Sequence, residues 1–228
     1  MSSRLVVINP NSTRAATRSI AEAVAVFGND QTTIDCLTID SGPPSIEKQR
    51  DVDRVVPHVL ERIVAEAPSA AGFVIACYSD PGVFAARELV DVPVFGVAQA
   101  TLGFAASMGA AIGVVTLRPA SAARHMAYAR ALGLSQRIVA ARAAQVSVVD
   151  LMEDQAVGRR MLACAEQLVR QDGADLVVLG CCGMSRFRQE IEDVLGVPVL
   201  DPTQVAVGAA LTAIRASYRT PPLGGARA

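Results

Sequence analysis

Short apolar runs alternate with longer segments of mixed polarity along the whole chain. The apolar runs are rich in Val, Ile and Leu, are bounded by Gly, Pro or Asp, and are short enough to predict strands. They cover residues 4–8, 32–39, 72–76, 92–96, 111–117, 136–140, 176–180 and 197–200, and helical spacing is found over 14–27, 47–66, 121–132 and 153–171. Because the strands are almost wholly apolar, we expect an α/β fold in which helices cover both faces of parallel sheets.

An internal repeat divides this pattern into two halves. The stretch "VPVFGVAQATLGFAA" at 92–106 matches "VPVLDPTQVAVGAAL" at 197–211, with an offset of 105 residues. Upstream, "AGFVIAC" at 71–77 is similar to "DLVVLGC" at 175–181, with an offset of 104. We therefore predict two pseudo-symmetric lobes, each a parallel sheet flanked by helices, with the active-site cleft between them. The expected lobes are residues 1–97 plus 203–228, and residues 98–202.

Composition narrows the class of protein. Hydrophobic residues make up 51% of the chain and charged residues 19%, so the chain can bury a large core. The formal net charge is −1 and no basic block is present, which argues against nucleic acid as a partner. No apolar run reaches the roughly 18 residues of a membrane span. The first residues lack the apolar core of a signal peptide, so we expect a cytoplasmic protein that binds a small molecule.

The cysteines do not follow the spacing of disulfide or zinc sites. Five are present, an odd number, and no CxxC motif occurs, which argues against a disulfide framework and a structural zinc site. The two histidines, His58 and His125, fall in helix-like segments away from the cysteines and are interpreted as ordinary helical residues. We therefore expect no metal.

Two cysteines occupy equivalent strand ends of the repeat. Cys77 follows one strand, and Ser79 or Asp80 is expected to cap the helix that comes next. Cys181 follows the equivalent strand, and Gly183 would let backbone N–H groups approach a ligand. A helix N-terminus favours a thiolate. A single buried cysteine is often only a small apolar residue, but a pair at equivalent positions indicates function.

Two opposed thiols suit proton transfer. One thiolate removes a proton from a carbon beside a carbonyl and a thiol on the other face returns one, which is racemisation. Hydrogen-bond donors for the intermediate are expected from Asn11, Ser12, Ser79 and Thr116, which follow strands, and from the backbone of the loops beside the cysteines. Single-cysteine acyl transfer or decarboxylation is an alternative, and a non-enzymatic small-molecule binding module is another.

Four motifs resemble a known family. "INPNST" (8–13), "GPPSIE" (42–47), "ACYSDPG" (76–82) and "LGCCGM" (179–184) are similar to motifs of the aspartate/glutamate/hydantoin racemase superfamily, and most of all to its hydantoin and allantoin racemase branch. The resemblance runs from about residue 4 to 217. It implies two-base racemisation without pyridoxal phosphate, another cofactor or a metal, and commonly a homo-oligomer.

The resemblance also implies roles for individual residues. Cys77 and Cys181 map onto the catalytic thiols, although the offset of 105 in the helical part of the repeat would select Cys182 instead. Cys182 stands where the family usually has alanine. A neutral hydantoin or allantoin ring is preferred to an acidic amino acid, because few Lys or Arg residues lie near the cysteines in sequence. The expected substrate-binding residues are Asn11, Ser45, Ile46, Ser79, Asp80, Thr116, Cys182 and Gly183.

Overall fold

The computed structural model describes residues 3–28, 31–109, 111–153 and 156–219, and all eight predicted strands are present in it. Residues 220–228, which the sequence assigned to the first lobe, lie outside the described residues. The strands are β1 (Ser3–Asn9), β2 (Thr32–Thr38), β3 (Gly72–Ile75), β4 (Val94–Gly96), β5 (Ile112–Thr116), β6 (Ile138–Ala143), β7 (Leu176–Leu179) and β8 (Val199–Leu200).

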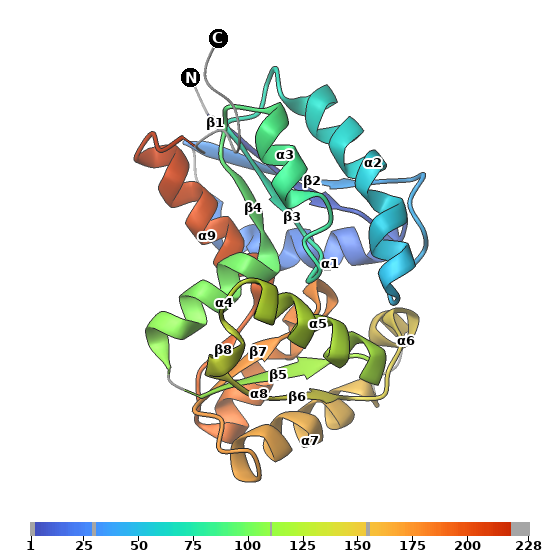
Figure 1. The fold of residues 1–228 in the computed structure, drawn as a ribbon, viewed down its shortest axis with the longest axis vertical. Coiled ribbons are helices and arrows are strands. Elements are labelled where there is room, and N and C mark those ends of the chain that lie inside the picture. Colours follow the sequence, from blue (N-terminus) through green and yellow to red (C-terminus); the bar gives the residue numbers. More distant parts are fainter. Residues whose placement is uncertain (1–2, 29–30, 110, 154–155, 220–228) are drawn as a thin grey trace.

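The strands form two four-stranded sheets with the same topology. The first has the order β2-β1-β3-β4 and the second β6-β5-β7-β8, and every pairing is parallel. Ile8 of β1 pairs with Ile75 of β3, and Val115 of β5 pairs with Leu179 of β7. The two sheets lie one above the other in Figure 1. The predicted two-lobed α/β fold is confirmed, and the repeat corresponds to one sheet per half.

Helices cover both faces of each sheet, as the apolar strands require. They are α1 (Arg14–Val24), α2 (Gln49–Glu66), α3 (Val83–Leu89), α4 (Val97–Met108), α5 (Pro119–Ala131), α6 (Val148–Glu153), α7 (Val157–Arg170), α8 (Arg188–Leu195) and α9 (Pro202–Arg215), with 3-10 turns η1 (Ala25–Phe27), η2 (Ser135–Arg137) and η3 (Cys182–Phe187). In β1, Leu5 and Val7 face α1 and α9, whereas Val6 and Ile8 face α2 and α3. This division follows from the alternation of side chains along a strand.

The second sheet is covered in the same way. On one face, Val177 and Leu179 of β7 pack with Met161 and Leu168 of α7. On the other face, Val178 of β7 packs against α4 and α5. Burial of one Val, Leu or Met side chain stabilises the fold by roughly 1.5–3 kcal/mol relative to its exposed state.

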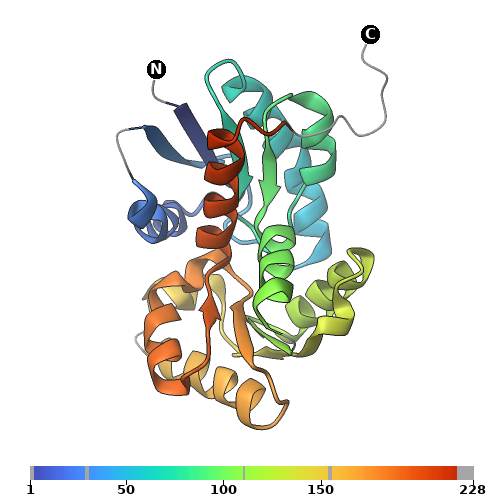
Figure 2. The same cartoon turned by 90° about the vertical axis from the view of Figure 1, so that its left-hand side faces the viewer.

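The helices α4 and α9 join the lobes. Each follows the last strand of one sheet and packs beside the other: α9 contacts β1, β3 and β4, and α4 contacts β7. The two helices lie against each other at the centre of Figure 2, and the Thr101 hydroxyl donates to the Pro202 carbonyl between them. These are the two copies of the V-P-V segment, so the repeat places its own helices along the line where the lobes meet.

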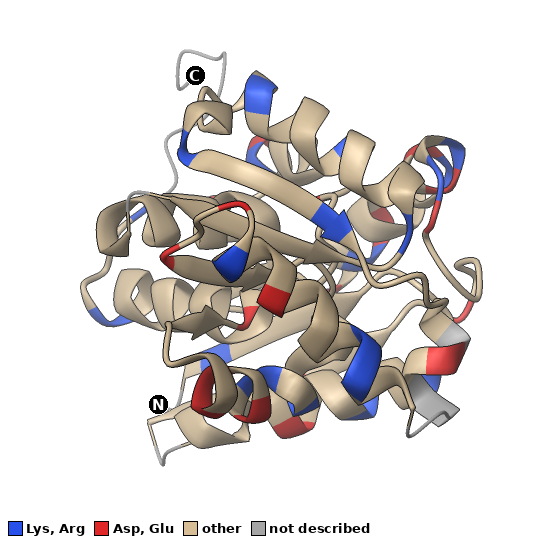
Figure 3. Cartoon of the chain, turned by 90° about the horizontal axis from the view of Figure 1, so that it is seen from below, with Lys and Arg blue, Asp and Glu red and all other residues tan. Residues whose placement is uncertain are grey.

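The charged residues lie mainly on the outer helices. Figure 3 shows Lys and Arg interspersed with Asp and Glu over the helices of the second lobe. Several charged residues pair with each other, as Arg142 of β6 does with Asp172, and Arg170 with Glu166 within α7. In the described part of the chain, every helix is too short or too polar to span a bilayer.

Candidate active site

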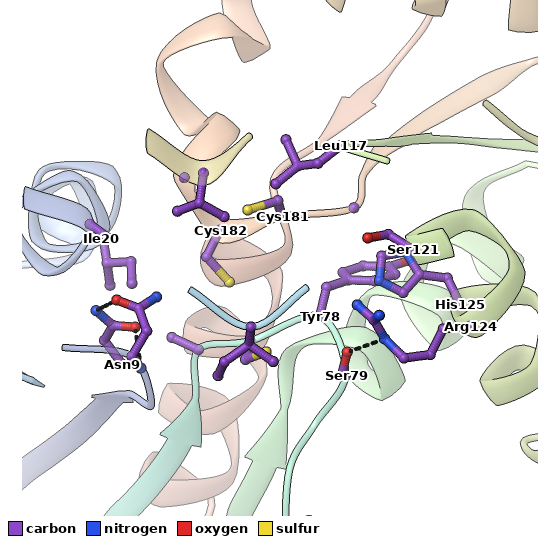
Figure 4. Close-up of a pocket in the computed structure, with 18 residues that line it drawn as sticks. Asn9, Ile20, Tyr78, Ser79, Leu117, Ser121, Arg124, His125, Cys181 and Cys182 are labelled. Atoms are coloured by element: carbon purple, nitrogen blue, oxygen red, sulfur yellow. Dashed lines mark hydrogen bonds between the residues drawn. The ribbon is translucent and has the colours of Figure 1, made fainter. Parts of the chain in front are cut away.

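A cavity lies at the carboxyl ends of the strands, where the two lobes face each other (Figure 4). Ligands of open α/β sheets bind at this edge, because the loops after parallel strands converge there. The described residues that line the cavity are Asn9, Asn11, Ala16, Ile20, Ile46, Ala76, Cys77, Tyr78, Ser79, Leu117, Ser121, Arg124, His125, Val148, Gly180, Cys181, Cys182 and Gly183.

Cys77 comes into the cavity two residues after β3. Its backbone N–H donates to the Ile75 carbonyl, and the Asp80 N–H donates to the Cys77 carbonyl, which fixes the turn. Burial raises the pKa of the Cys77 thiol to about 11, although hydrogen bonds from Ser79 and the charge of Arg124 favour the thiolate. The expectation of a helix N-terminus beside this thiol is not met, because α3 begins only at Val83.

Cys181 reaches the same cavity from the second lobe, two residues after β7. The preceding Gly180 donates its N–H to the Val115 carbonyl at 2.7 Å, so the chain passes very close to β5. Burial raises the pKa of the Cys181 thiol to about 12, and the Gly183 N–H opposes this shift. The nearby Cys77 thiol raises it further, since two thiolates in one cavity repel each other.

Cys182 also lines the cavity. Side chains alternate between two faces only within a strand, and β7 ends at Leu179 before η3 begins at Cys182. Cys181 and Cys182 can therefore both line the cavity. Figure 4 shows both thiols on the same side of the cavity. Cys182 is buried and belongs to an apolar cluster that includes Val7 and Ala76 of the first lobe, and burial raises the pKa of its thiol well above the usual range. Cys182 is therefore part of the lobe interface as well as of the lining.

Two asparagines from the end of β1 form a hydrogen-bonded pair in the cavity. The Asn9 side chain is buried and donates to the Thr17 hydroxyl at 2.9 Å and to Asn11 Oδ1 at 3.2 Å. Asn11 Oδ1 also accepts from the Thr13 N–H. Among the described residues the hydrogen bonds of Asn11 use its Oδ1 atom and its backbone N–H, which leaves the Nδ2 group for a ligand. The sequence singled out Asn11 but missed Asn9, which holds it.

Helix α5 contributes four residues that the sequence did not assign to the site, and His125 among them, interpreted as an ordinary helical residue, is buried in the cavity wall. Ser121, Arg124 and His125 line the cavity, and Tyr128 lies behind it. Arg124 Nε donates to the Ser79 hydroxyl at 3.2 Å, and Arg124 Nη1 donates to the Glu47 carbonyl at 2.7 Å. The sequence pattern of α5 does not indicate which face of the helix meets the other lobe, so these contacts could not be predicted from it.

His125 packs against Tyr78 across the lobe boundary. Their ring centroids are 4.8 Å apart, and both side chains are buried. Burial lowers the pKa of His125 to about 3, which keeps the imidazole neutral, and raises the pKa of Tyr78. Among the described residues, neither the Tyr78 hydroxyl nor His125 Nδ1 has a hydrogen-bond partner.

Three of the expected substrate-binding residues lie outside the lining. Thr116 is fully buried, and its hydroxyl donates to the Arg118 and Arg142 carbonyls. Ser45 precedes the lining residue Ile46 but does not line the cavity itself. Asn11, Ile46, Ser79, Cys182 and Gly183 do line it.

Asp80, the third residue outside the lining, has a structural role. The expectation that Ser79 or Asp80 caps the following helix is wrong, because Gly82 is the N-cap of α3 and makes no side-chain cap. The Asp80 carboxylate instead accepts from the backbone N–H groups of Ala98 and Gln99, at the start of α4. It also accepts from the Tyr128 hydroxyl at 3.1 Å, so it ties the Cys77 loop to both lobes.

The described residues contain no group of His, Cys, Asp and Glu side chains that could hold a metal ion. The lining is mostly apolar, and its polar groups are two asparagines, two serines, the thiols, the Tyr78 hydroxyl and the neutral His125 imidazole, with Arg124 as the one cation among the described lining residues. Such a site can orient a small neutral molecule between two thiols.

Comparisons with known proteins identify the family of this chain. Residues 5–210 match the Asp/Glu/Hydantoin racemase family. The hydantoin racemase of Paenarthrobacter aurescens is 34% identical over 95% of this chain and 93% of its own length. Allantoin racemase from Klebsiella pneumoniae has a TM-score of 0.93 at 30% identity and covers 98% of this chain and 92% of its own. Allantoin racemase from Pseudomonas fluorescens has a TM-score of 0.92 at 29% identity, covering 97% and 94%. The chain therefore belongs to the Asp/Glu/hydantoin racemase family, in its hydantoin and allantoin racemase branch, and is an isomerase of the racemase type.

Proposed function

We propose that this enzyme racemises 5-substituted hydantoins or allantoin, without a cofactor, by proton transfer between Cys77 and Cys181. The observation that carries the proposal is that these thiols come from equivalent strand ends of the two lobes and line one cavity. A ring held between them presents opposite faces of its C5 carbon to the two sulfurs.

In the reaction, one thiolate removes the proton on C5, next to the ring carbonyl, and becomes a thiol. The electron pair of the C–H bond moves into an enolate. The opposite thiol then gives its proton to the other face of C5 and becomes a thiolate, so atoms and charge balance. Two groups in different protonation states are required, and each direction of racemisation starts from a different one.

Residues around the thiols would bind the ring and the enolate. The Asn11 Nδ2 group is a donor at the cavity wall for the enolate, while Ser79 and Gly183 direct their donors to the thiols of Cys77 and Cys181. Ile46 and Cys182 supply apolar surface beside them. Preorganised donors of this kind stabilise a developing negative charge by about 2.7–4 kcal/mol each where measured.

The character of the lining favours a neutral ring over an acidic amino acid. Ile20, Ile46, Leu117 and Val148 make much of the cavity apolar. The guanidinium of Arg124 is already engaged by Ser79 and the Glu47 carbonyl. The two carboxylates of an aspartate or glutamate substrate would have to share the Arg124 cation, which would leave one negative charge buried without a partner.

The test uses enantiopure substrate in D2O. Incubation with a 5-substituted hydantoin or with allantoin should abolish the optical rotation and introduce solvent deuterium at C5. Because hydantoins also epimerise slowly in buffer, the rate is compared with that of enzyme-free samples. Unchanged rotation across hydantoins, allantoin and aspartate or glutamate would refute the racemase proposal, whereas ligand-dependent thermal stabilisation without turnover would favour a binding module.

Variants test the assignment of the thiols. Cys77→Ser and Cys181→Ser should each abolish racemisation, while one of them can still exchange the C5 proton of a single enantiomer. Cys36→Ser is the matched control, because Cys36 lies in β2 and outside the cavity lining. An inactive Cys182→Ala together with an active Cys181→Ala would show that Cys182 is the second thiol.

A further inference from the structure

The two lobes do not surround their thiols in the same way, although their topology is the same. In the repeat counted from the strands, Cys77 corresponds to Cys181 and Ser79 corresponds to Gly183. The first lobe therefore has a hydroxyl two residues after its cysteine, and the second lobe has only a backbone N–H there. This difference bears on which thiol is ionised before substrate binds.

Cys77 has two donors from one residue. Both the backbone N–H and the hydroxyl of Ser79 form hydrogen bonds that favour the Cys77 thiolate. The hydroxyl is held by Arg124, whose Nε lies 3.2 Å from Ser79 Oγ. Because Ser79 Oγ accepts from Arg124, its own proton is left to point to the sulfur. The guanidinium adds a positive charge near the same thiol.

Arg124 reaches this position from the opposite lobe. It belongs to α5, and its second contact, to the Glu47 carbonyl at 2.7 Å, ties it to the loop before α2. Two loops of the first lobe are thus joined through one side chain of the second, and Figure 4 shows the Arg124–Ser79 bond at the cavity wall.

Cys181 has no comparable support among the described residues. Helix α1 of the first lobe packs against η3, and it contributes Ala16 and Ile20 to the lining, both apolar. The Gly183 N–H is the one hydrogen bond that favours the Cys181 thiolate, whereas the carboxylates of Asp201 and Glu47 disfavour it. The pseudo-symmetry of the fold is therefore broken in the electrostatics of the site.

We propose that Arg124 is a positioning residue that holds the Ser79 hydroxyl against Cys77, so that the first thiolate of the resting enzyme forms at Cys77 while Cys181 keeps its proton. This inference rests on the proposed two-thiol racemisation and adds which thiol acts first as base. Racemisation of one enantiomer then begins directly, by proton removal at Cys77. The other enantiomer requires a proton to move from Cys181 to Cys77, through solvent or through a preceding turnover.

The remaining titratable groups near the thiols do not make Cys181 the more readily ionised of the two. Asp80 disfavours the Cys77 thiolate, but its carboxylate is turned to the start of α4. His125 is neutral, so it offers no competing cation. Asp51 lies near Arg124 and favours its charged form. These contacts agree with the lower pKa of Cys77, which is about 11 against about 12 for Cys181.

The experiment measures alkylation of the resting enzyme, without substrate. Iodoacetamide labelling is followed from pH 7 to 11, and peptide mass spectrometry gives the rate at each cysteine. Cys77 should react about tenfold faster than Cys181 at pH 9. Arg124→Met should lower the Cys77 rate about tenfold between pH 8 and 10, because the loss of an adjacent positive charge raises the pKa of a thiol by about one unit or more. The rate at Cys181 should not fall.

Matched variants separate positioning from a general loss of structure. Arg124→Lys should restore part of the Cys77 rate, since the charge returns without the fork to Ser79 and the Glu47 carbonyl. Arg130→Met, an exposed position on the same helix, is the control and should leave both profiles unchanged. Cys36 serves as an internal reference thiol.

Two results would overturn the proposal: a faster Cys181 in the wild type, or an Arg124→Met protein of native circular dichroism with an unchanged Cys77 profile. If Arg124→Met does not fold, Ser79→Ala carries the test, with the same fall in the Cys77 rate expected and an unchanged profile again decisive against it. The labelling rates do not depend on catalytic turnover. An enzyme that labels asymmetrically but racemises no hydantoin would refute the proposed function and leave the role of Arg124 standing.

Discussion

Replacing Gly180 with alanine tests whether the close approach of β7 and β5 positions Cys181. A Cβ atom at Gly180 would lie 2.7 Å from the Val115 carbonyl oxygen and 3.3 Å from His125 Nδ1. The carbonyl belongs to the backbone of β5 and cannot rotate away, so the end of β7 must move outward and weaken the 2.7 Å bond from the Gly180 N–H. Overpacking of this kind costs about 1–3 kcal/mol. Cys181 moves with the strand, and a misplacement of 1 Å can cost about 100-fold in rate.

A second glycine provides the control. Gly103 lies in the exposed face of α4, and a Cβ there would meet no atom within 4 Å. Gly103→Ala should therefore stabilise the protein by about 0.5–1 kcal/mol, because alanine has less backbone freedom to lose. Urea unfolding followed by circular dichroism measures both changes, and each kcal/mol corresponds to a Tm shift of about 2–4 °C for a chain of this size. If Gly180→Ala were as stable and active as the wild type, the strand contact would not be what positions Cys181.

Three further outcomes follow from the structure. Because burial raises the pKa of Cys77 to about 11 and of Cys181 to about 12, kcat/KM should rise about tenfold per pH unit between pH 7 and 10, and a flat profile in racemase assays would contradict the thiolate base. Asp80→Ala should lower the free energy of unfolding by about 1–3 kcal/mol, since it leaves two backbone N–H groups of α4 without their acceptor; an unchanged urea midpoint would show that water replaces the carboxylate. Met161→Ala should cost about 2–5 kcal/mol in the same measurement, because the side chain is fully buried in the core between α7 and the second sheet, and a loss below 1 kcal/mol would mean that the core collapses around it.

The fold could be predicted because its signals are local. Each strand is a short apolar run, and each main helix has apolar residues at helical spacing, as at Val157, Met161 and Leu168 of α7. The repeat then pairs the two halves and places Cys77 and Cys181 at equivalent strand ends. Asn11 was found in the same way, because it follows a buried strand at the edge where ligands bind.

Residues on helices and in turns were less predictable. Nothing local distinguishes Arg124 from the exposed Arg130 on the same helix, and the contact of Arg124 with Ser79 joins residues 45 positions apart. Asp80 has the sequence signature of a helix cap, yet the chain turns there and carries the carboxylate to the start of α4 instead of α3.

The sequence by itself determined the two sheets, their duplication and the thiols at their ends, because hydrophobic periodicity and strand-end chemistry are properties of neighbouring residues. Only the tertiary structure decided how the thiols differ. The docking of α5 onto the first lobe places Arg124 beside Ser79, while the docking of α1 onto the second lobe places Ala16 and Ile20 near Cys181. Charge and desolvation act through space, so the environment of each thiol depends on which helix of the other lobe faces it.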